Sequence, residues 1–473
     1  METTVLVVDL DETLVKTDML FETFWSSVSR DWRVLFSAVS AMSKGRAQLK
    51  RFLAQTGEID IDRLPYNETV VNYIQDWRAK GGKTALVTAS DQTLADRIAT
   101  HLNLFDEVHG SDGSHNLKGR HKAEFLAKQY GERNFAYLGD HAADLPVWER
   151  ASKAVTLDVS GAVSAKVDEL DITAEHLTSR SQSIKPYLKE LRPQQWLKNL
   201  LILIPMLAGH QIEAETILQS ALAFVAFCAV ASSVYVLNDL LDLSADRAHP
   251  TKRHRPFASG AIPMAHSIWL ALGPLALGLI IAAFLGVQFL AVMLVYYALT
   301  FAYSMWLKRI VIIDICVLAG LYTLRIFAGS AATSITISDW LLEFSLFFFL
   351  ALATVKRHAE LVDCAASGKT TAAGRGYHVD DLPVVSQLGT AAGLVSVMVL
   401  ALYFHSPKVA EDYSSPAILW GSSVVLIYWL ARVQMVTHRG GMTDDPIVFA
   451  IKDRVSWLCL FAIIGFVVGA LYI

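Results

Sequence analysis

Charged residues are distributed so unevenly along this chain that its two parts must fold in different surroundings. Residues 1–190 contain 51 Asp, Glu, Lys and Arg, about 27% of the segment, whereas residues 191–473 contain 35, about 12%. The first share is typical of a soluble domain. The second accompanies repeated apolar runs of about 20 residues, the length of a helix that crosses a membrane. The sequence therefore predicts a soluble domain followed by a polytopic membrane domain, and it excludes a wholly soluble enzyme.

Nine apolar segments of the second part are candidate membrane spans. They cover about 197–209, 216–237, 265–285, 288–306, 311–330, 338–355, 385–405, 417–435 and 455–473. The Lys and Arg between the spans lie in alternate loops, and the other loops hold only Lys408. Because basic loops stay in the cytosol, we expect a multi-pass protein of the cytoplasmic (inner) membrane with a cytosolic N-terminal domain. A net charge of −4 argues against a general nucleic-acid binder.

The soluble part alternates short apolar strands with helical stretches. Residues 5–14, 83–90 and 135–140 each read as a buried strand that leads into polar residues. This order is typical of a doubly wound α/β domain, which binds ligands at the carboxyl ends of its parallel strands. We assign this domain to residues 1–160, expect a linker over 161–190, and assign an all-α membrane domain to 191–473.

The polar residues that follow these strands suit phosphoryl transfer. They are Asp9, Asp11, Thr88, Asp140 and Asp144, together with Lys122 at the start of a helix. Phosphoryl transfer needs mainly positioning and charge neutralisation. We expect Asp9 to attack phosphorus and Asp11 to act as general acid and base, while Thr88 and Lys122 hold phosphate oxygens. A Mg²⁺ site is expected among Asp9, Asp11, Asp140 and Asp144, because this ion prefers carboxylate and phosphate oxygens.

These elements, in this order, resemble the haloacid dehalogenase superfamily of phosphatases over residues 1 to about 160. The resemblance implies a phosphatase because Asp11 is an acid, and the segment GRHKAEFL favours Lys122 over Lys118 as the phosphate-binding base. A helical insert over about 17–80 is then expected to be a small cap that selects the substrate. The alternatives are an ordinary acidic turn and a domain that only senses phosphate.

An acidic motif, NDxxDxxxD, lies where the second span meets the cytosol. It comprises Asn238, Asp239, Asp242 and Asp246. The spacing predicts that the three carboxylates share one helical face, where Mg²⁺ bound to a diphosphate substrate would relieve their repulsion. The next loop adds bases for the same anionic group, namely Lys252, Arg253 and Arg255. A solvated acidic loop is the alternative.

The acidic motif resembles that of the UbiA superfamily of intramembrane prenyltransferases, and the match runs from about Arg192 to Ile473. Further segments resemble its decaprenyl-phosphate phosphoribosyltransferase branch: RPxQWxKN (192–199), DRAHPTKRxRP (246–256), YSxxLKR (303–309), KRxxEL (356–361) and DDPxxFAxxDR (444–454). Where other members have a second aspartate-rich motif, this chain has Lys356, Arg357, Glu360 and Asp363. This mixed cluster suits phosphoribosyl diphosphate better than a plain prenyl diphosphate.

The resemblance implies Mg²⁺-dependent transfer of 5-phosphoribose from phosphoribosyl diphosphate to a polyprenyl phosphate. Asp239 and Asp242 are the expected catalytic residues and, with Asp246, the expected metal ligands. Asn238 and the loop bases are expected to bind substrate, as are Lys198, Tyr303, Lys308, Arg325, Lys356, Arg357, Glu360 and Tyr377. Lys308 is also explained by the preference for bases in cytosolic loops. Asp314 and Arg325 share one face of the fifth span and line a cavity or pair with another span.

The combined prediction is a bifunctional membrane enzyme whose phosphatase domain removes the 5-phosphate of the lipid-linked product. One alternative is a prenyltransferase that uses a prenyl diphosphate donor on an aromatic or other acceptor. Another is an anion transporter with a phosphate-sensing domain, against which the lack of an internal repeat counts. Lipid chain length and oligomeric state stay open.

Overall fold

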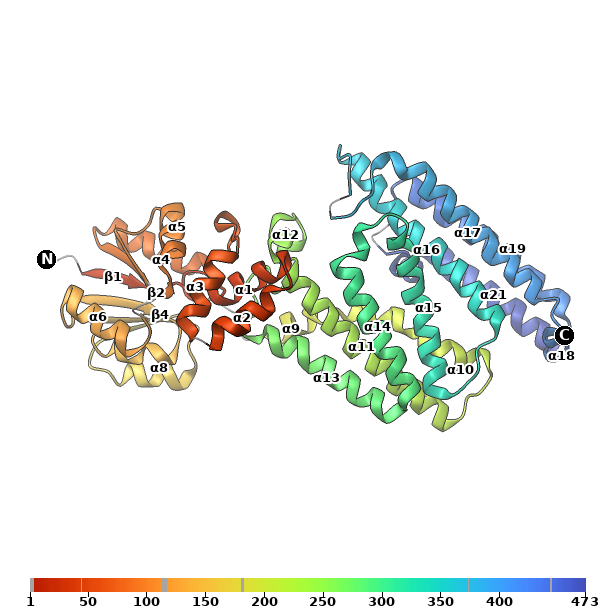
Figure 1. Ribbon diagram of the computed structural model, residues 1–473, viewed down its shortest axis with the longest axis horizontal. Helices are drawn as coiled ribbons and strands as arrows, with labels where there is room; N and C mark the ends of the chain where they lie inside the picture. Colours follow the sequence, from red (N-terminus) through yellow and green to blue (C-terminus); the bar gives the residue numbers. More distant parts are fainter. Residues whose placement is uncertain (1–3, 44, 112–116, 180–182, 373, 443–444) are drawn as a thin grey trace. The chain divides into compact units, whose positions relative to one another are not determined.

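The computed structural model describes residues 4–43, 45–111, 117–179, 183–372, 374–442 and 445–473. They form two compact units, each continuous in space but not in sequence (Figure 1). The first unit comprises residues 1–192 and 235–273, and the second comprises residues 193–234 and 274–473.

A six-stranded parallel sheet lies at the centre of the first unit, in the order β3-β2-β1-β4-β5-β6. Its strands are β1 (Val5–Val8), β2 (Lys83–Asp91), β3 (Glu107–Ser111), β4 (Phe135–Gly139), β5 (Lys153–Leu157) and β6 (Thr173–Leu177). Val8 of β1 pairs with Leu86 of β2 and with Leu138 of β4. The polar residues that follow these strands are thereby placed at one edge of the sheet. The doubly wound α/β fold is confirmed.

Helices cover both faces of the sheet (Figure 1). One face is covered by α4 (Glu68–Ala79) and α5 (Gln92–Leu102), and the other by α6 (Arg120–Tyr130), α7 (Leu145–Trp148) and α8 (Gly161–Asp168). Side chains of β2 alternate between the two cores: Leu86 is buried in one, and Ala85 and Val87 in the other. This alternation follows from the two-residue repeat of a strand.

The linker predicted over 161–190 is wrong in its first part. Residues 161–168 form α8, whose Val167 is buried in the core, and residues 173–177 form β6, which pairs with β5. The sequence did not predict this strand because apolar and polar residues alternate only weakly in its segment TAEHL, which has no apolar run. A single helix, α9 (Lys185–Glu190), lies in the rest of the predicted linker.

The predicted cap contains three helices and a 3-10 turn. They are α1 (Met19–Arg30), α2 (Val34–Ser43), α3 (Arg46–Thr56) and η1 (Ile61–Arg63). Helix α4 also falls within the predicted 17–80, but its Val70 and Ile74 are fully buried in the core of the sheet domain. The cap therefore ends before α4.

The first unit also contains the segment that carries the acidic motif. It includes the last turns of α11 (Ala214–Leu241), α12 (Leu243–Ala248), η4 (Lys252–His254), η5 (Met264–His266) and the first turns of α13 (Ser267–Leu285). Trp25 of α1 is buried in one cluster with Leu240, Leu243 and Phe257 of this segment. The cap helix and the motif segment therefore share an apolar core.

The second unit is helical. After η3 (Pro193–Leu203) and α10 (Ile204–Ala208), its long helices are α11, α13, α14 (Val287–Met305), α15 (Ile313–Thr333), α16 (Asp339–Ala366), α17 (Leu382–Tyr403), α19 (Trp420–His438) and α21 (Arg454–Tyr472). Short elements connect them: η6 (Leu307–Arg309), η7 (Val379–Asp381), α18 (Pro407–Asp412), η8 (Pro416–Leu419) and α20 (Pro446–Lys452). Helix α16 packs against α15, α17 and α19.

Seven helices in the described part of the chain are long and apolar enough to cross a membrane, so this is a multi-pass membrane protein. The predicted count of nine is not confirmed. Helix α16 is long, but its apolar stretch lies between Asp339 and Glu343 at one end and Lys356 at the other. The first predicted span, 197–209, is divided between η3 and α10, because a 3-10 helix occupies most of it.

Candidate active sites

The structure brings three predicted metal ligands together at the carboxyl edge of the sheet. Oxygens of Asp9, Asp140 and Asp144 lie within 4.8 Å of one another, and these residues form a group that could hold a metal ion. Asp140 also accepts a hydrogen bond of 3.0 Å from Thr13. Gly139 allows this approach, since a Cβ there would lie only 2.7 Å from Asp144 Oδ2.

The acidic group has the electrostatics of a cation site. Burial raises the pKa of Asp140 well above its usual value, and the charges of Asp9 and Asp144 raise it further. Burial likewise raises the pKa of Asp144, against the lowering effect of Lys122. Carboxylates that repel each other in a buried place favour a bound cation. The donor set fits Mg²⁺, which takes carboxylate oxygens and leaves positions for phosphate.

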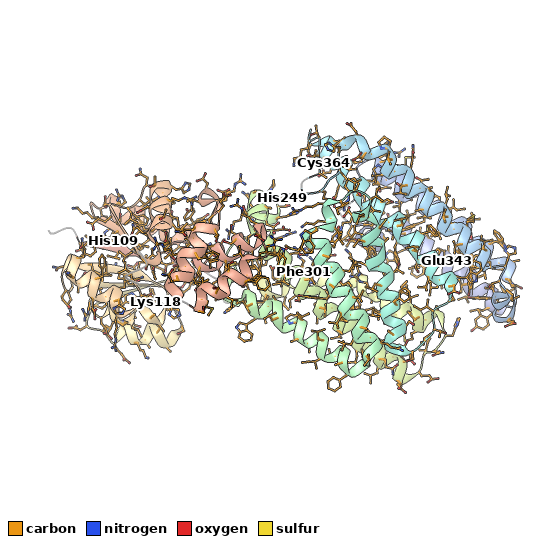
Figure 2. The ribbon with its side chains drawn as sticks, in the orientation of Figure 1. His109, Lys118, His249, Phe301, Glu343 and Cys364 are labelled. Carbon is orange, nitrogen blue, oxygen red and sulfur yellow. The ribbon has the colours of Figure 1, made fainter. Side chains whose placement is uncertain are left out.

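Lys122 is the base that reaches the predicted nucleophile. Its buried Nζ lies 2.9 Å from Asp9 Oδ2 and donates a 3.0 Å hydrogen bond to the Tyr137 hydroxyl. Burial alone would lower the pKa of Lys122, but Asp9 and Asp144 raise it above its usual value, so the ammonium stays charged. Lys118, the alternative, is exposed on the sheet domain (Figure 2).

Asp11 lies outside the three-carboxylate group. Its oxygens accept hydrogen bonds from the Met19 N–H (2.8 Å) and from Ser90 Oγ (2.6 Å), and the Ser90 N–H donates to Thr88 Oγ1 at 3.0 Å. Burial, assisted by the charge of Asp18, raises the pKa of Asp11 to about 7. This environment suits a proton donor and acceptor near neutral pH better than a metal ligand.

The acidic motif crosses a one-residue interruption between two helices, over which the N–H groups of Asp242 and Asp246 still bond to the carbonyls four residues before them. Helix α11 ends at Leu241 and α12 begins at Leu243, so Asp242 lies at a break between two helices. Asp239 and Asp246 remain linked, because Arg255 NH1 lies 3.0 Å from Asp239 Oδ1 and 2.5 Å from Asp246 Oδ2.

Arginines hold the motif's carboxylates in this structure. Arg192 NH2 donates to Asp239 Oδ1 at 2.5 Å, and the guanidinium stacks 5.3 Å from the ring of Tyr235. Among the described residues, the three motif carboxylates do not meet within the reach of one ion. A cation here would bind one or two of them together with substrate oxygens, which is a donor set that Mg²⁺ accepts.

Glu190 is a buried acid beside the motif. Burial raises the pKa of its carboxyl to about 8, and the charge of Asp239 adds to this effect. Neither Glu190 oxygen has a hydrogen-bond donor within the described residues. A neutral carboxyl at this position avoids the cost of burying an unpaired charge.

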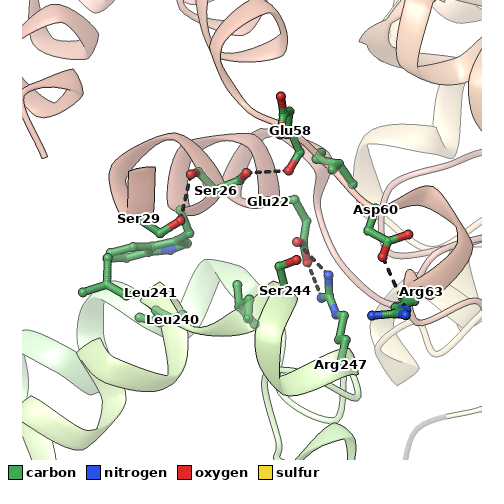
Figure 3. Close-up of a pocket in the computed structure, with 13 residues that line it drawn as sticks. Glu22, Ser26, Ser29, Glu58, Asp60, Arg63, Leu240, Leu241, Ser244 and Arg247 are labelled. Atoms are coloured by element: carbon green, nitrogen blue, oxygen red, sulfur yellow. Dashed lines mark hydrogen bonds and ion pairs between the residues drawn. The ribbon is translucent and has the colours of Figure 1, made fainter. Parts of the chain in front are cut away.

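The cap is joined to the motif segment by a buried ion pair. Arg247, adjacent to Asp246, donates two hydrogen bonds of 2.9 and 2.6 Å to the Glu22 carboxylate of α1 (Figure 3). Arg247 Nε also donates to the Ala258 carbonyl, and Thr17 donates to Glu22. Bidentate pairing of this kind fixes orientation as well as distance.

In the second unit, Asp314 lies at the centre of a charged network. It is fully buried, and its oxygens bind Arg357 Nε (2.7 Å), Arg375 NH1 (2.9 Å) and the Tyr303 hydroxyl (2.7 Å). Glu360 pairs with both arginines. Asp314 therefore pairs with α16 and with the segment that follows this helix.

Tyr377 and Arg325 are also engaged within the protein. The buried Tyr377 hydroxyl accepts a 2.8 Å hydrogen bond from the Ile312 N–H, and its ring lies 5.5 Å from the Arg357 guanidinium. Arg325 donates to Asn199 Oδ1, to the Leu321 carbonyl and to the Tyr296 hydroxyl. The polar groups of both side chains are therefore engaged by contacts within the protein, and their binding of substrate stays a prediction.

The remaining predicted binding residues lie at several places. Lys198 pairs with Asp445, and both act electrostatically on Lys356 of α16. Asp444 of the quoted segment lies outside the described residues. Lys252 and Arg253 are exposed on η4, whereas Asn238 and Lys308 are half-buried.

Comparison with known proteins identifies the family of the chain. Residues 202–452 match the model of the UbiA prenyltransferase family. The chain belongs to this family. Residues 6–149 match the haloacid dehalogenase-like hydrolase model, so this UbiA protein carries a phosphatase-type domain in front of its membrane domain.

Three relatives differ in how much of this UbiA protein they match. The uncharacterized protein y4nM of Sinorhizobium fredii is 39% identical over 96% of this chain and 88% of its own length. The nodulation protein NoeC of Azorhizobium caulinodans is 37% identical over 61% of this chain and 92% of its own. The decaprenyl-phosphate phosphoribosyltransferase of Mycolicibacterium smegmatis is 36% identical over 60% and 92%.

Several residues of these sites were not among the predicted ones. Tyr137 connects Lys122, Asp9 and Asp144, but in the segment FAYLGD it reads as an ordinary strand residue. Arg192 and Asp445 lie in segments that carry the family resemblance, so those segments were the available signal. No local pattern marks Glu22 or Arg375, because their partners are distant in the sequence.

Proposed function

We propose that this UbiA protein transfers 5-phosphoribose from phosphoribosyl diphosphate to a polyprenyl phosphate and then removes the 5-phosphate from the lipid-linked product. The observation that supports this proposal is that two groups of known proteins resemble different shares of the chain. A relative named for the transfer reaction matches 60% of this chain and 92% of its own length, and this chain also contains a segment that matches the haloacid dehalogenase-like hydrolase model, with the acidic group of Asp9, Asp140 and Asp144. The product of the first reaction retains a phosphomonoester, which is the substrate that such a constellation would hydrolyse.

In the transfer step, the bond from the anomeric carbon of ribose to the diphosphate breaks, and an oxygen of the lipid phosphate bonds to that carbon. Asp239 and Asp242 would hold Mg²⁺, which neutralises charge on the departing diphosphate. Arg192 and Arg255 lie beside Asp239 and supply N–H donors for phosphate oxygens. The second unit offers a separate group of bases, Lys198 and Lys356, which we also assign to phosphate binding.

In the hydrolytic step, Asp9 attacks the phosphorus of the 5-phosphate, and the bond from phosphorus to the sugar oxygen breaks. Asp11 gives its proton to that oxygen and then takes a proton from the water that hydrolyses the acyl phosphate. Lys122 and Thr88 hold the phosphate oxygens. A Mg²⁺ ion at Asp9, Asp140 and Asp144 would neutralise phosphate charge. The products are inorganic phosphate and a lipid-linked ribose.

Both reactions are assigned to the cytosolic side of the inner membrane. The basic loops predict this orientation, and the donor is a soluble, highly charged metabolite that needs access from the cytosol.

The test uses the full-length protein in membranes with labelled phosphoribosyl diphosphate and several polyprenyl phosphates. The wild-type protein is expected to give a lipid-linked ribose without the 5-phosphate. The Asp9→Asn variant should accumulate the lipid that carries one additional phosphate group, visible by mass spectrometry. Formation of the dephosphorylated lipid at the wild-type rate by purified Asp9→Asn protein would refute the second step. Labelled lipid made only from prenyl diphosphate would instead support the alternative prenyltransferase.

A further inference from the structure

Helix α2 of the cap presents large apolar side chains to its surroundings. Phe36, Val39 and Met42 are 69%, 71% and 60% exposed, and Ala38 alone is buried in this helix. Single exposed apolar residues are common on soluble proteins, but several on one short helix mark an interaction surface.

The residues of α2 divide into three sides. The side that packs against α1 and α3 carries the buried or half-buried Val34, Ala38 and Ala41. The outer side carries Leu35, Phe36, Val39 and Met42. Ser37 lies on the third side: at about 100° per residue it is roughly 160° from Val39 and roughly 100° from Phe36. Ser40 lies at the border of the outer side, roughly 40° from Phe36. Ser37 is therefore the exposed polar residue that is separated from the apolar side of the helix.

Bases outnumber acids in the sequence around α2. After Asp31, residues 32–53 contain no Asp or Glu, and their bases are Arg33, Lys44, Arg46, Lys50 and Arg51. Arg33 and Arg51 are exposed, whereas Lys50 donates a hydrogen bond to the Ala89 carbonyl. Trp32 stands two residues before the first residue of the helix and is partly exposed. An apolar helical face with flanking bases and an aromatic residue is the composition of helices that lie in the interface of an anionic membrane.

The packing of the cap brings α2 close to where two spans end. Helix α1, which contacts α2, buries Trp25 in a cluster with Leu240 at the end of α11 and Ala271 at the start of α13. The Glu22–Arg247 ion pair holds the same helix (Figure 3). Helix α2 therefore lies beside a helix that packs on the ends of two candidate membrane spans.

We propose that α2 lies in the membrane surface, with Leu35, Phe36, Val39 and Met42 among the lipid chains and with the exposed Arg33 and Arg51 at anionic headgroups. Helix α1 begins at Met19, whose N–H binds Asp11. Insertion of α2 therefore holds the candidate phosphatase site at the membrane, where a lipid-linked phosphate would be found.

The test measures depth in the membrane without any substrate, so its outcome is separate from the proposed reactions. Full-length protein with its native cysteines replaced by alanine receives one spin label, at Phe36→Cys or Val39→Cys, with Ser37→Cys as the matched control on the same helix. The protein is placed in nanodiscs of phosphatidylethanolamine and phosphatidylglycerol. Collisions of the label with oxygen, which enters lipid, and with a water-soluble nickel chelate are then compared.

The expected result is greater access of oxygen than of nickel chelate at positions 36 and 39, and the reverse at position 37. If one variant fails to fold, Leu35→Cys and Met42→Cys on the same side replace it. Free access of the nickel chelate to all positions would overturn the proposal. Labels at 36 and 39 that are shielded from both reagents would also overturn it, because a second copy or another protein would then cover the helix.

Discussion

At the residue scale, the two parts of the chain differ in how far the charge of their buried acids is compensated by neighbouring bases. Asp9, Asp140 and Asp144 are acids with too little positive charge around them, and their electrostatics favour a cation. Asp314 instead has two arginines in contact with it, so its charge is already neutralised by the protein. The first arrangement favours a bound cation, whereas the second needs no ligand because its charges compensate one another.

Replacement of Asp314 by Asn is expected to destabilise the membrane domain. Arg357 and Arg375 would be left buried without a full counter-charge, and breaking a buried ion pair typically costs about 3–5 kcal/mol. Thermal unfolding in detergent should show a clearly lower midpoint. Asp363→Asn, an exposed acid on the same helix as Arg357, is the control and should leave the midpoint unchanged. Equal midpoints for both variants would contradict the structural assignment.

Replacement of Asp239 by Asn is expected to abolish formation of the lipid-linked sugar while phosphomonoesterase activity persists. The reason is that the amide cannot hold a cation with the strength of a carboxylate, whereas the phosphatase constellation contains no residue of the motif. The two activities are measured on the same purified protein, so each controls for folding. Wild-type amounts of glycolipid from this variant would show that the carboxylate is not needed for transfer.

At the scale of elements, helix α1 occupies a central position in the first unit. Its first N–H binds Asp11, its Glu22 binds Arg247, and its Trp25 packs on the ends of two spans. One short helix therefore contacts both the phosphatase constellation and the segment of the acidic motif.

Replacement of Glu22 by Gln is expected to loosen α1. The pair with Arg247 is almost fully buried, so its loss leaves an uncompensated guanidinium, whereas the exposed Arg30–Glu58 pair contributes at most about 1 kcal/mol. Hydrogen exchange of α1 amides should become at least about tenfold faster in Glu22→Gln, which corresponds to roughly 1.4 kcal/mol. Glu58→Gln is the matched control and should exchange at nearly the wild-type rate. Similar rates in both variants would mean that the ion pair does not hold the helix.

At the scale of the whole molecule, the division into units does not follow the predicted domains. The first unit continues past residue 160 to include β6, and it takes up residues 235–273 from the middle of the membrane part. The unit that contains the phosphatase-type domain therefore includes residues that the hydropathy pattern assigns to the linker and to the membrane domain.

A soluble fragment of residues 1–160 is expected to be less stable than one of residues 1–192. The shorter fragment loses β6 and Val167, so β5 becomes an unprotected edge and part of the core is exposed. Thermal unfolding and light scattering of the two fragments provide the measurement. Equal melting temperatures and equal solubility would show that β6 contributes little.

The sequence alone determined the features that depend on local pattern. The alternation of strands with helices predicted the doubly wound domain, long apolar runs predicted the membrane helices, and short motifs predicted Asp9, Lys122, Asp140 and the acidic motif. Such features can be predicted because each depends on residues close together in the sequence. They are the periodicity of side chains, the length of a membrane span and the chemistry of a set of ligands.

Only the tertiary structure decided the features that join distant residues. The edge strand β6 is too short and polar to be recognised from its sequence, and only the folded chain shows that Arg255 joins Asp239 to Asp246 across the interruption at Asp242. The partners of Asp314, the role of Tyr137 and the Glu22–Arg247 pair arise from segments up to 225 residues apart in the chain. The local sequence does not predict these contacts, because burial and charge compensation depend on how distant segments pack in the folded molecule.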